Sequence, residues 1–134
     1  METRDINRLA IILKHSKNIL DIINKYHIAY DDFKSDNVYY MSIMFCFIQI
    51  GEMANGLSKG FKSEYPNLPI GSMIKTRNVI AHSYDKVDMD IIWNTCKNDI
   101  PVLIKQIEDL GKKYNFSDEE VPIEIDSLLQ EIKH

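Results

Sequence analysis

Several features that would assign a functional class at once are scarce or missing in this sequence. There are only two cysteines, Cys46 and Cys96, and their separation matches no metal-binding spacing, so we expect two buried free thiols in a reducing compartment. The longest apolar run, residues 38–50, is too short to cross a bilayer, and the N-terminus lacks the basic-then-apolar order of a signal peptide. We therefore expect a cytoplasmic protein that does not contact membranes.

The chain also lacks a glycine-rich phosphate loop, internal repeats and a strongly basic balance. Its 134 residues include 45% hydrophobic residues, five glycines and four prolines, which suits a single domain, 1–134. The net charge of −4 excludes a generally basic nucleic-acid binder. Residues 59–86, however, hold five lysines and arginines against two acidic residues. This local excess would favour an anionic substrate, although chance clustering of surface lysines predicts the same composition.

Apolar residues recur at three- and four-residue steps, which predicts an all-α protein. Helices are predicted over about residues 5–26, 36–59, 69–83 and 88–110. In the first helix, His15 is predicted to lie on the surface. The segment 60–69 is predicted to be a loop. Asp88 is a suitable N-cap for the fourth helix and Gly111 a natural residue just past its end, while Pro101 should kink or split it.

The second predicted helix is unusually apolar. Eleven of the thirteen residues from 38 to 50 are apolar or aromatic. A helix that is apolar nearly all round must be covered nearly all round, and a domain of this size rarely has the surface to do so. We therefore predict a homodimer. The aromatic and β-branched content leaves a buried strand as an alternative, but the pattern continues through residue 57, which favours a helix.

The C-terminal tail, 112–134, differs in character from the core at about 5–110. Residues 117–120 resemble a helix-capping box, but Pro122 interrupts it. Leu128, Leu129 and Ile132 are spaced to form a short closing helix.

The chemically richest stretch is Thr76–Tyr84, with the sequence TRNVIAHSY. Arg77 offers a planar, permanently charged fork that suits a phosphate. His82 can give or take a proton near neutral pH. Asn78 adds an amide and Tyr84 a hydroxyl. Together these groups could hold a phosphodiester and move protons around it.

Helical geometry limits how these groups cooperate. Arg77 and His82, five residues apart, point roughly 140° apart on a helix, whereas Asn78 and His82 share a face. Either the chain turns near His82 and re-aims the ring, or a second copy completes the site. Glu52 is either an ordinary surface charge or a partner of Arg77. In the simplest interpretation, Arg77 is only an ion-paired surface residue and His82 a favourable partner of the helix dipole.

The stretch resembles the signature of HepT-like proteins, which belong to the HEPN superfamily: Arg, four residues, His, any residue, Tyr. Three further segments agree with that family's second- and fourth-helix patterns: residues 51–58, 87–93 and 99–103. The resemblance covers roughly residues 5–110. Many relatives carry a Trp after the proline that opens the third helix, whereas Pro69 is followed here by Ile70 and Gly71.

The resemblance implies an HEPN-type up-and-down bundle of four to five helices with a kinked fourth helix. It also implies a ribonuclease toxin of a type VII toxin–antitoxin system, acting on RNA as a homodimer whose two motifs face each other. The partner would be an MntA-like minimal nucleotidyltransferase antitoxin that transfers AMP onto the motif tyrosine, which is Tyr84 by motif match. No cofactor and no metal are expected.

Within that implied function, Arg77 and His82 would be the catalytic residues, while Asn78 and Tyr84 would bind or orient the RNA. Glu52 would give support. The main alternative is a non-catalytic HEPN module that binds a nucleotide or a partner. In a purely structural alternative, Arg77 pairs with Glu52 and His82 caps a helix.

Overall fold

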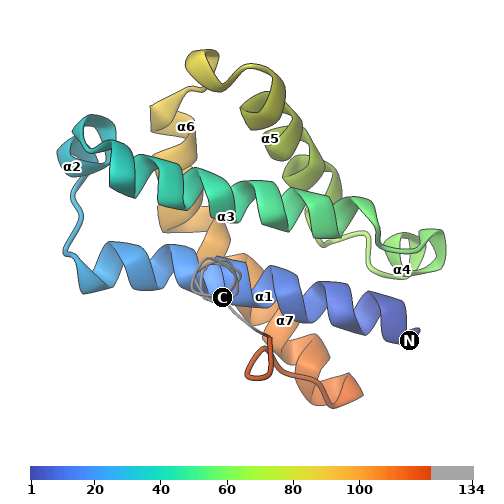
Figure 1. Ribbon diagram of the computed structural model, residues 1–134. Coiled ribbons are helices and arrows are strands. Elements are labelled where there is room, and N and C mark those ends of the chain that lie inside the picture. Colours follow the sequence, from blue (N-terminus) through green and yellow to red (C-terminus); the bar gives the residue numbers. More distant parts are fainter. Residues whose placement is uncertain (122–134) are drawn as a thin grey trace, which may run out of the picture.

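The computed structural model describes residues 1–121, and these residues are helical without any strand (Figure 1). The four longer helices are α1 (Thr3–Lys25), α3 (Asn37–Asn55), α5 (Ile70–His82) and α7 (Ile100–Tyr114). The shorter elements are α2 (Tyr30–Ser35), α4 (Lys59–Glu64), the 3₁₀ turn η1 (Tyr84–Lys86), α6 (Met89–Asn94) and the π-helical turn η2 (Thr95–Asp99). The predicted all-α fold is confirmed, and in the described part no helix is long and apolar enough to span a membrane.

Helix α3 is the central element of the bundle. It runs antiparallel to α1 on one side and packs against α5 on the other, while α7 crosses α1 (Figure 1). The buried core residues come mainly from these four helices and include Leu9, Ile12, Ile43, Met44, Ile80 and Ile107. Helix α5 packs chiefly on α3, and its other main contact is with the turn η1 that follows it. The position of α5 therefore depends largely on its interface with α3.

One face of α3 is only partly covered by the rest of the chain. Val38 and Met41 are 70% and 60% exposed, and Phe45 and Ile48 are half-buried. These four residues, called the α3 stripe below, follow one another at steps of three or four and therefore share a helix face. Glu52 continues the same face by one turn. The predicted shortage of cover for this helix is confirmed, whereas the homodimer inferred from it stays a prediction.

The second helix ends earlier than predicted, and the predicted loop contains α4. The Ser58 hydroxyl caps α4 by accepting a hydrogen bond from the Phe61 amide at 3.1 Å. Asp5 holds this cap in place, because its carboxylate accepts hydrogen bonds from the Ser58 amide at 2.8 Å and the Ser58 hydroxyl at 2.7 Å. Asp5 is therefore buried although it is charged. These contacts span more than fifty residues, so local spacing gave no sign of them.

The fourth predicted helix is continuous but irregular. Asp88 caps it as predicted, accepting hydrogen bonds from the amides of Asp90 and Ile91. Pro101, predicted to kink or split this helix, does not split it. The irregularity is the π turn η2, which immediately precedes α7 and widens the helix where the proline ring would otherwise meet a carbonyl one turn back. The predicted end at Gly111 is wrong. The helix continues to Tyr114, and Asn115 adopts the left-handed conformation, with φ 58°, that ends it.

Buried side chains reveal two further outcomes. His15 is 4% exposed and packs edge-on against Phe45, so the surface position predicted for it is wrong. Cys46 and Cys96 are buried free thiols as expected, and burial raises the pKa of both to about 12. Beyond α7, buried Asp118 forms an ion pair of 2.9 Å with Lys17 of α1. The closing helix predicted around Leu128–Ile132 lies outside the described residues.

Candidate functional site

The residues singled out by the sequence lie at the C-terminal end of α5 and in the turn that follows. Arg77, Asn78 and His82 belong to α5, and Tyr84 opens η1. Asn78, His82 and Tyr84 are exposed, whereas Arg77 is partly buried against α3. The site is thus an open surface of one helix end rather than an enclosed pocket.

Arg77 is held by two neighbours. Its Nε lies 2.5 Å from Oε1 of Glu52 on α3, but the N–H is not aimed at the carboxylate, so the contact is an ion pair rather than a directional hydrogen bond. One terminal nitrogen, Nη1, donates a hydrogen bond of 3.1 Å to Oδ1 of Asn78. Neither contact uses Nη2. The pairing of Glu52 with Arg77, one of two alternatives from the sequence, is therefore the observed one.

His82 is the last residue of α5 and is exposed. Its ring makes no hydrogen bond or ion pair with any other residue of the described part. Because the helix includes His82, the ring leaves the helix roughly 140° away from Arg77. The turn that follows does not re-aim it, and a single chain does not bring Arg77 and His82 onto one face. Asn78 and His82 do share a face, as their spacing predicted.

Tyr84 rests on an aromatic cluster that the sequence analysis did not identify. Its ring, 43% exposed, meets buried Tyr40 of α3 edge-on, with 5.4 Å between centroids. Tyr40 in turn packs on Phe33, and Phe33 on Trp93. Partial burial raises the pKa of Tyr84 above its ordinary value of 10. The phenol is therefore protonated at neutral pH, and its ring is partly exposed and packed on Tyr40.

The charges and exposure of this region define what it can do. Arg77 presents a fixed cation, Asn78 an amide and His82 an exposed imidazole, which suit binding of a phosphate and transfer of a proton. Glu52 connects this group to the α3 stripe, because it lies one turn beyond Ile48 on the same face of α3. Among residues 1–121, no cluster of three or more His, Cys, Asp and Glu side chains could hold a metal ion.

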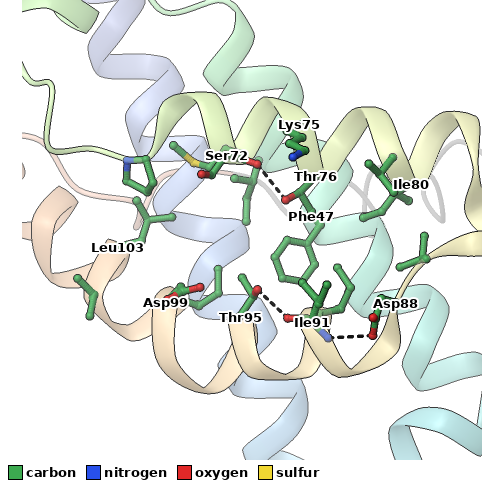
Figure 2. A pocket seen from close by; sticks show the side chains of 18 of the residues that line it. Phe47, Ser72, Lys75, Thr76, Ile80, Asp88, Ile91, Thr95, Asp99 and Leu103 are labelled. Carbon is green, nitrogen blue, oxygen red and sulfur yellow. Dashed lines mark hydrogen bonds between the residues drawn. The ribbon is translucent and has the colours of Figure 1, made fainter.

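A groove runs along α5 on the face next to the one that carries Asn78 and His82. Figure 2 shows α5 on one side and α6, η2 and the start of α7 on the other, with Phe47 of α3 between them. The cavity has a volume of about 760 Å³, and its lining includes Ile80, Ile91, Ile92 and Leu103. Its end beside η1 is lined by Lys86, Val87 and Asp88. Helix α5 therefore borders both the candidate site and this groove.

Comparison with known proteins gives consistent matches. The family model for HepT-like ribonucleases matches residues 12–110. A presumed RNase of Methanocaldococcus jannaschii is 31% identical over 120 residues, which are 89% of this chain and 98% of that protein. A second presumed RNase of the same organism is 28% identical over the same shares. The probable ribonuclease HepT of Thermococcus cleftensis is 32% identical over 63% of this chain and 77% of its own. No solved structure matches.

Proposed function

Because the chain belongs to the HepT-like ribonuclease family, we propose that it is a metal-independent ribonuclease toxin whose site is completed by a second copy and silenced by AMP transfer to Tyr84. The observation that carries this proposal is the layout of α5. Arg77 is anchored to Glu52, and His82 stands exposed about one and a half turns further along the helix, on a different face. A phosphate bound by one Arg77 therefore needs a proton-transfer group from elsewhere, and a second His82 supplies it.

The α3 stripe supports the dimer. It exposes Val38 and Met41 beside half-buried Phe45 and Ile48, and covering such a stripe with a second copy removes apolar surface from water. A two-fold contact uses the same patch on both copies. Since Glu52 continues the stripe and holds Arg77, contact between two stripes would bring the two Arg77 side chains close to a common cleft.

The proposed cleavage reaction uses the 2′-hydroxyl of the RNA as the nucleophile. A base takes the proton of the 2′-hydroxyl, and the 2′-oxygen attacks the adjacent phosphorus. The bond to the 5′-oxygen breaks and that oxygen receives a proton, leaving a 2′,3′-cyclic phosphate and a 5′-hydroxyl. In the proposed site His82 of one or both copies serves as base and acid. Arg77 binds the phosphate and stabilises the charge that develops on it, while Asn78 orients His82 or donates to the phosphate.

Silencing by an MntA-like nucleotidyltransferase requires an accessible hydroxyl, and Tyr84 is 43% exposed. The Tyr84 oxygen would attack the α-phosphorus of ATP, pyrophosphate would leave, and a base of the transferase would accept the phenolic proton. The AMP group adds bulk and negative charge two residues from His82. It would therefore block the cleft and repel RNA.

The test is cleavage of RNA by purified protein in the presence of EDTA, with intact mass confirming that Tyr84 carries no AMP. His82→Asn is compared with His27→Asn, a control at another exposed histidine whose left-handed backbone asparagine tolerates. We expect loss of activity of about 10²–10⁴-fold for His82→Asn and none for His27→Asn. Equal activity of both variants would refute the role of His82. An unmodified wild type that bound RNA without cleaving it would instead support the non-catalytic binding module.

A further inference from the structure

We propose that the groove between α5 and α6–α7 is the docking site for an amphipathic helix of the nucleotidyltransferase that modifies Tyr84. This inference rests on the proposed function and adds the surface by which the partner is recognised. It starts from the position of the groove. Lys86, Val87 and Asp88, which line one end, follow Tyr84 in the chain within four residues. An enzyme seated in the groove would therefore lie close to the turn that carries Tyr84.

The lining of the groove suits an apolar protein segment rather than a polar ligand. Phe47 and Ile50 form the floor, and exposed Ile91 and Val102, 62% and 58% exposed, stand on the α6–α7 side. The threonine hydroxyls on the two walls are already used within their own helices: Thr76 donates to the Ser72 carbonyl at 2.9 Å and Thr95 to the Ile91 carbonyl at 2.8 Å (Figure 2). At these two positions the walls therefore present methyl groups.

Charge and length describe the occupant more closely. Lys75 and Lys86 line the groove from α5 and η1, and Asp88 and Asp99 line it from the opposite wall. None of these four side chains forms an ion pair with another residue of the part described. A helix with acidic residues along one edge and basic residues along the other would complement both walls. The groove follows α5, whose thirteen residues span about 20 Å, so it suits roughly three to four turns.

A second copy of this chain fits the groove poorly. A two-fold contact centred on the groove would place groove against groove, and two concave surfaces cannot fill each other. The most exposed apolar residues of α3, Val38 and Met41, belong to the α3 stripe instead. The structure therefore separates two apolar surfaces: the stripe for the proposed dimer and the groove for a different protein.

The experiment measures AMP transfer to the full-length chain by an MntA-like minimal nucleotidyltransferase, with ATP and with intact mass as the readout. Ile91→Asp and Val102→Asp are compared with wild type and with Ile91→Val, which keeps the apolar surface. We expect kcat/KM for AMP transfer to fall at least tenfold in both aspartate variants through a higher KM, with kcat retained at saturation. Ile91→Val should match wild type. A higher KM with unchanged kcat indicates that docking is weakened, whereas a lower kcat would indicate that Tyr84 itself is displaced.

Two further readouts keep the outcomes distinct. RNA cleavage and dimer mass by light scattering should be unchanged in Ile91→Asp, while Met41→Asp in the α3 stripe should yield a monomer. Unchanged KM in both aspartate variants would overturn the groove proposal and leave the proposed function intact. A lower kcat at unchanged KM would also overturn it. Absence of AMP on wild-type Tyr84 would overturn the proposed silencing and the docking site together.

Discussion

Gly51 and Arg77 lie so close together that the helices carrying them can cross only because position 51 has no side chain. A Cβ built on Gly51 would overlap the Cβ of Arg77 and lie 2.8 Å from the Met73 carbonyl oxygen. The backbone of α3 therefore supports the stem of Arg77, and the neighbouring Glu52 holds its charged end. This contact determines where the candidate phosphate-binding group stands.

Substituting Gly51→Ala should separate α3 from α5 and displace Arg77. We expect a loss of about 1–3 kcal/mol in the free energy of unfolding, as for other overpacked positions, together with a clear loss of RNA cleavage. Gly71→Ala in the same helix as Arg77 is the matched control, because a Cβ there meets nothing within 4 Å. That control should be stabilised by about 0.4–1 kcal/mol. Urea unfolding and cleavage assays would check both, and equal behaviour of the two variants would contradict the contact described.

The ion pair between Glu52 and Arg77 should contribute little to stability. The two side chains are 31% (Arg77) and 43% (Glu52) exposed, and pairs at such positions contribute up to about 1 kcal/mol. A double-mutant cycle of Glu52→Gln and Arg77→Gln, measured by urea unfolding, should give a coupling energy below that value. Cleavage should instead fall strongly in Arg77→Gln and less in Glu52→Gln. A large coupling energy with no activity to lose would favour the purely structural interpretation of Arg77.

Replacing Tyr84 by Phe should separate cleavage from silencing. The ring contact with Tyr40 is kept, so we expect a stability change within about 0.5 kcal/mol and RNA cleavage that is at least partly retained. AMP transfer should be absent, as judged by intact mass after incubation with ATP and the nucleotidyltransferase. Tyr26→Phe, at another exposed tyrosine, should still gain AMP. Continued silencing of Tyr84→Phe by AMP transfer would show that another residue is the acceptor.

The ion pair between Lys17 and Asp118 should make stability depend on alkaline pH. The hydrogen bond to Asp118 raises the pKa of Lys17 above its ordinary value of 10.5. A raised pKa in the folded state means that the stabilisation is fully present below about 10.5 and is lost as the pH rises through the folded value. Asp118→Asn should cost about 1–2 kcal/mol at pH 8, since it weakens a charged hydrogen bond to a partly exposed lysine. The difference from wild type should shrink by pH 11.5, which urea unfolding at each pH would measure.

Apolar spacing was enough to assign the helical class and most of the long helices, because it reports directly which face each helix buries. The sequence also identified the candidate residues Arg77, Asn78, His82 and Tyr84. They lie in one short stretch, so their proximity to one another could be inferred without the tertiary structure. Asp88 was recognisable as a cap because its hydrogen bonds reach only two and three residues ahead. Such features are local, and local features can be read from spacing.

The features that join distant segments depended on tertiary packing. Asp5 is buried because it binds Ser58, the cap of α4, more than fifty residues away, and His15 is buried because α3 covers it. Tyr40 became the support of Tyr84 through the packing of η1 on α3. Of the two roles open to Glu52, the crossing of α3 and α5 at Gly51 selected the pair with Arg77. These contacts depend on which helix faces meet in the folded protein. The sequence pattern indicates which residues must be buried or paired, but it does not indicate which residues they contact.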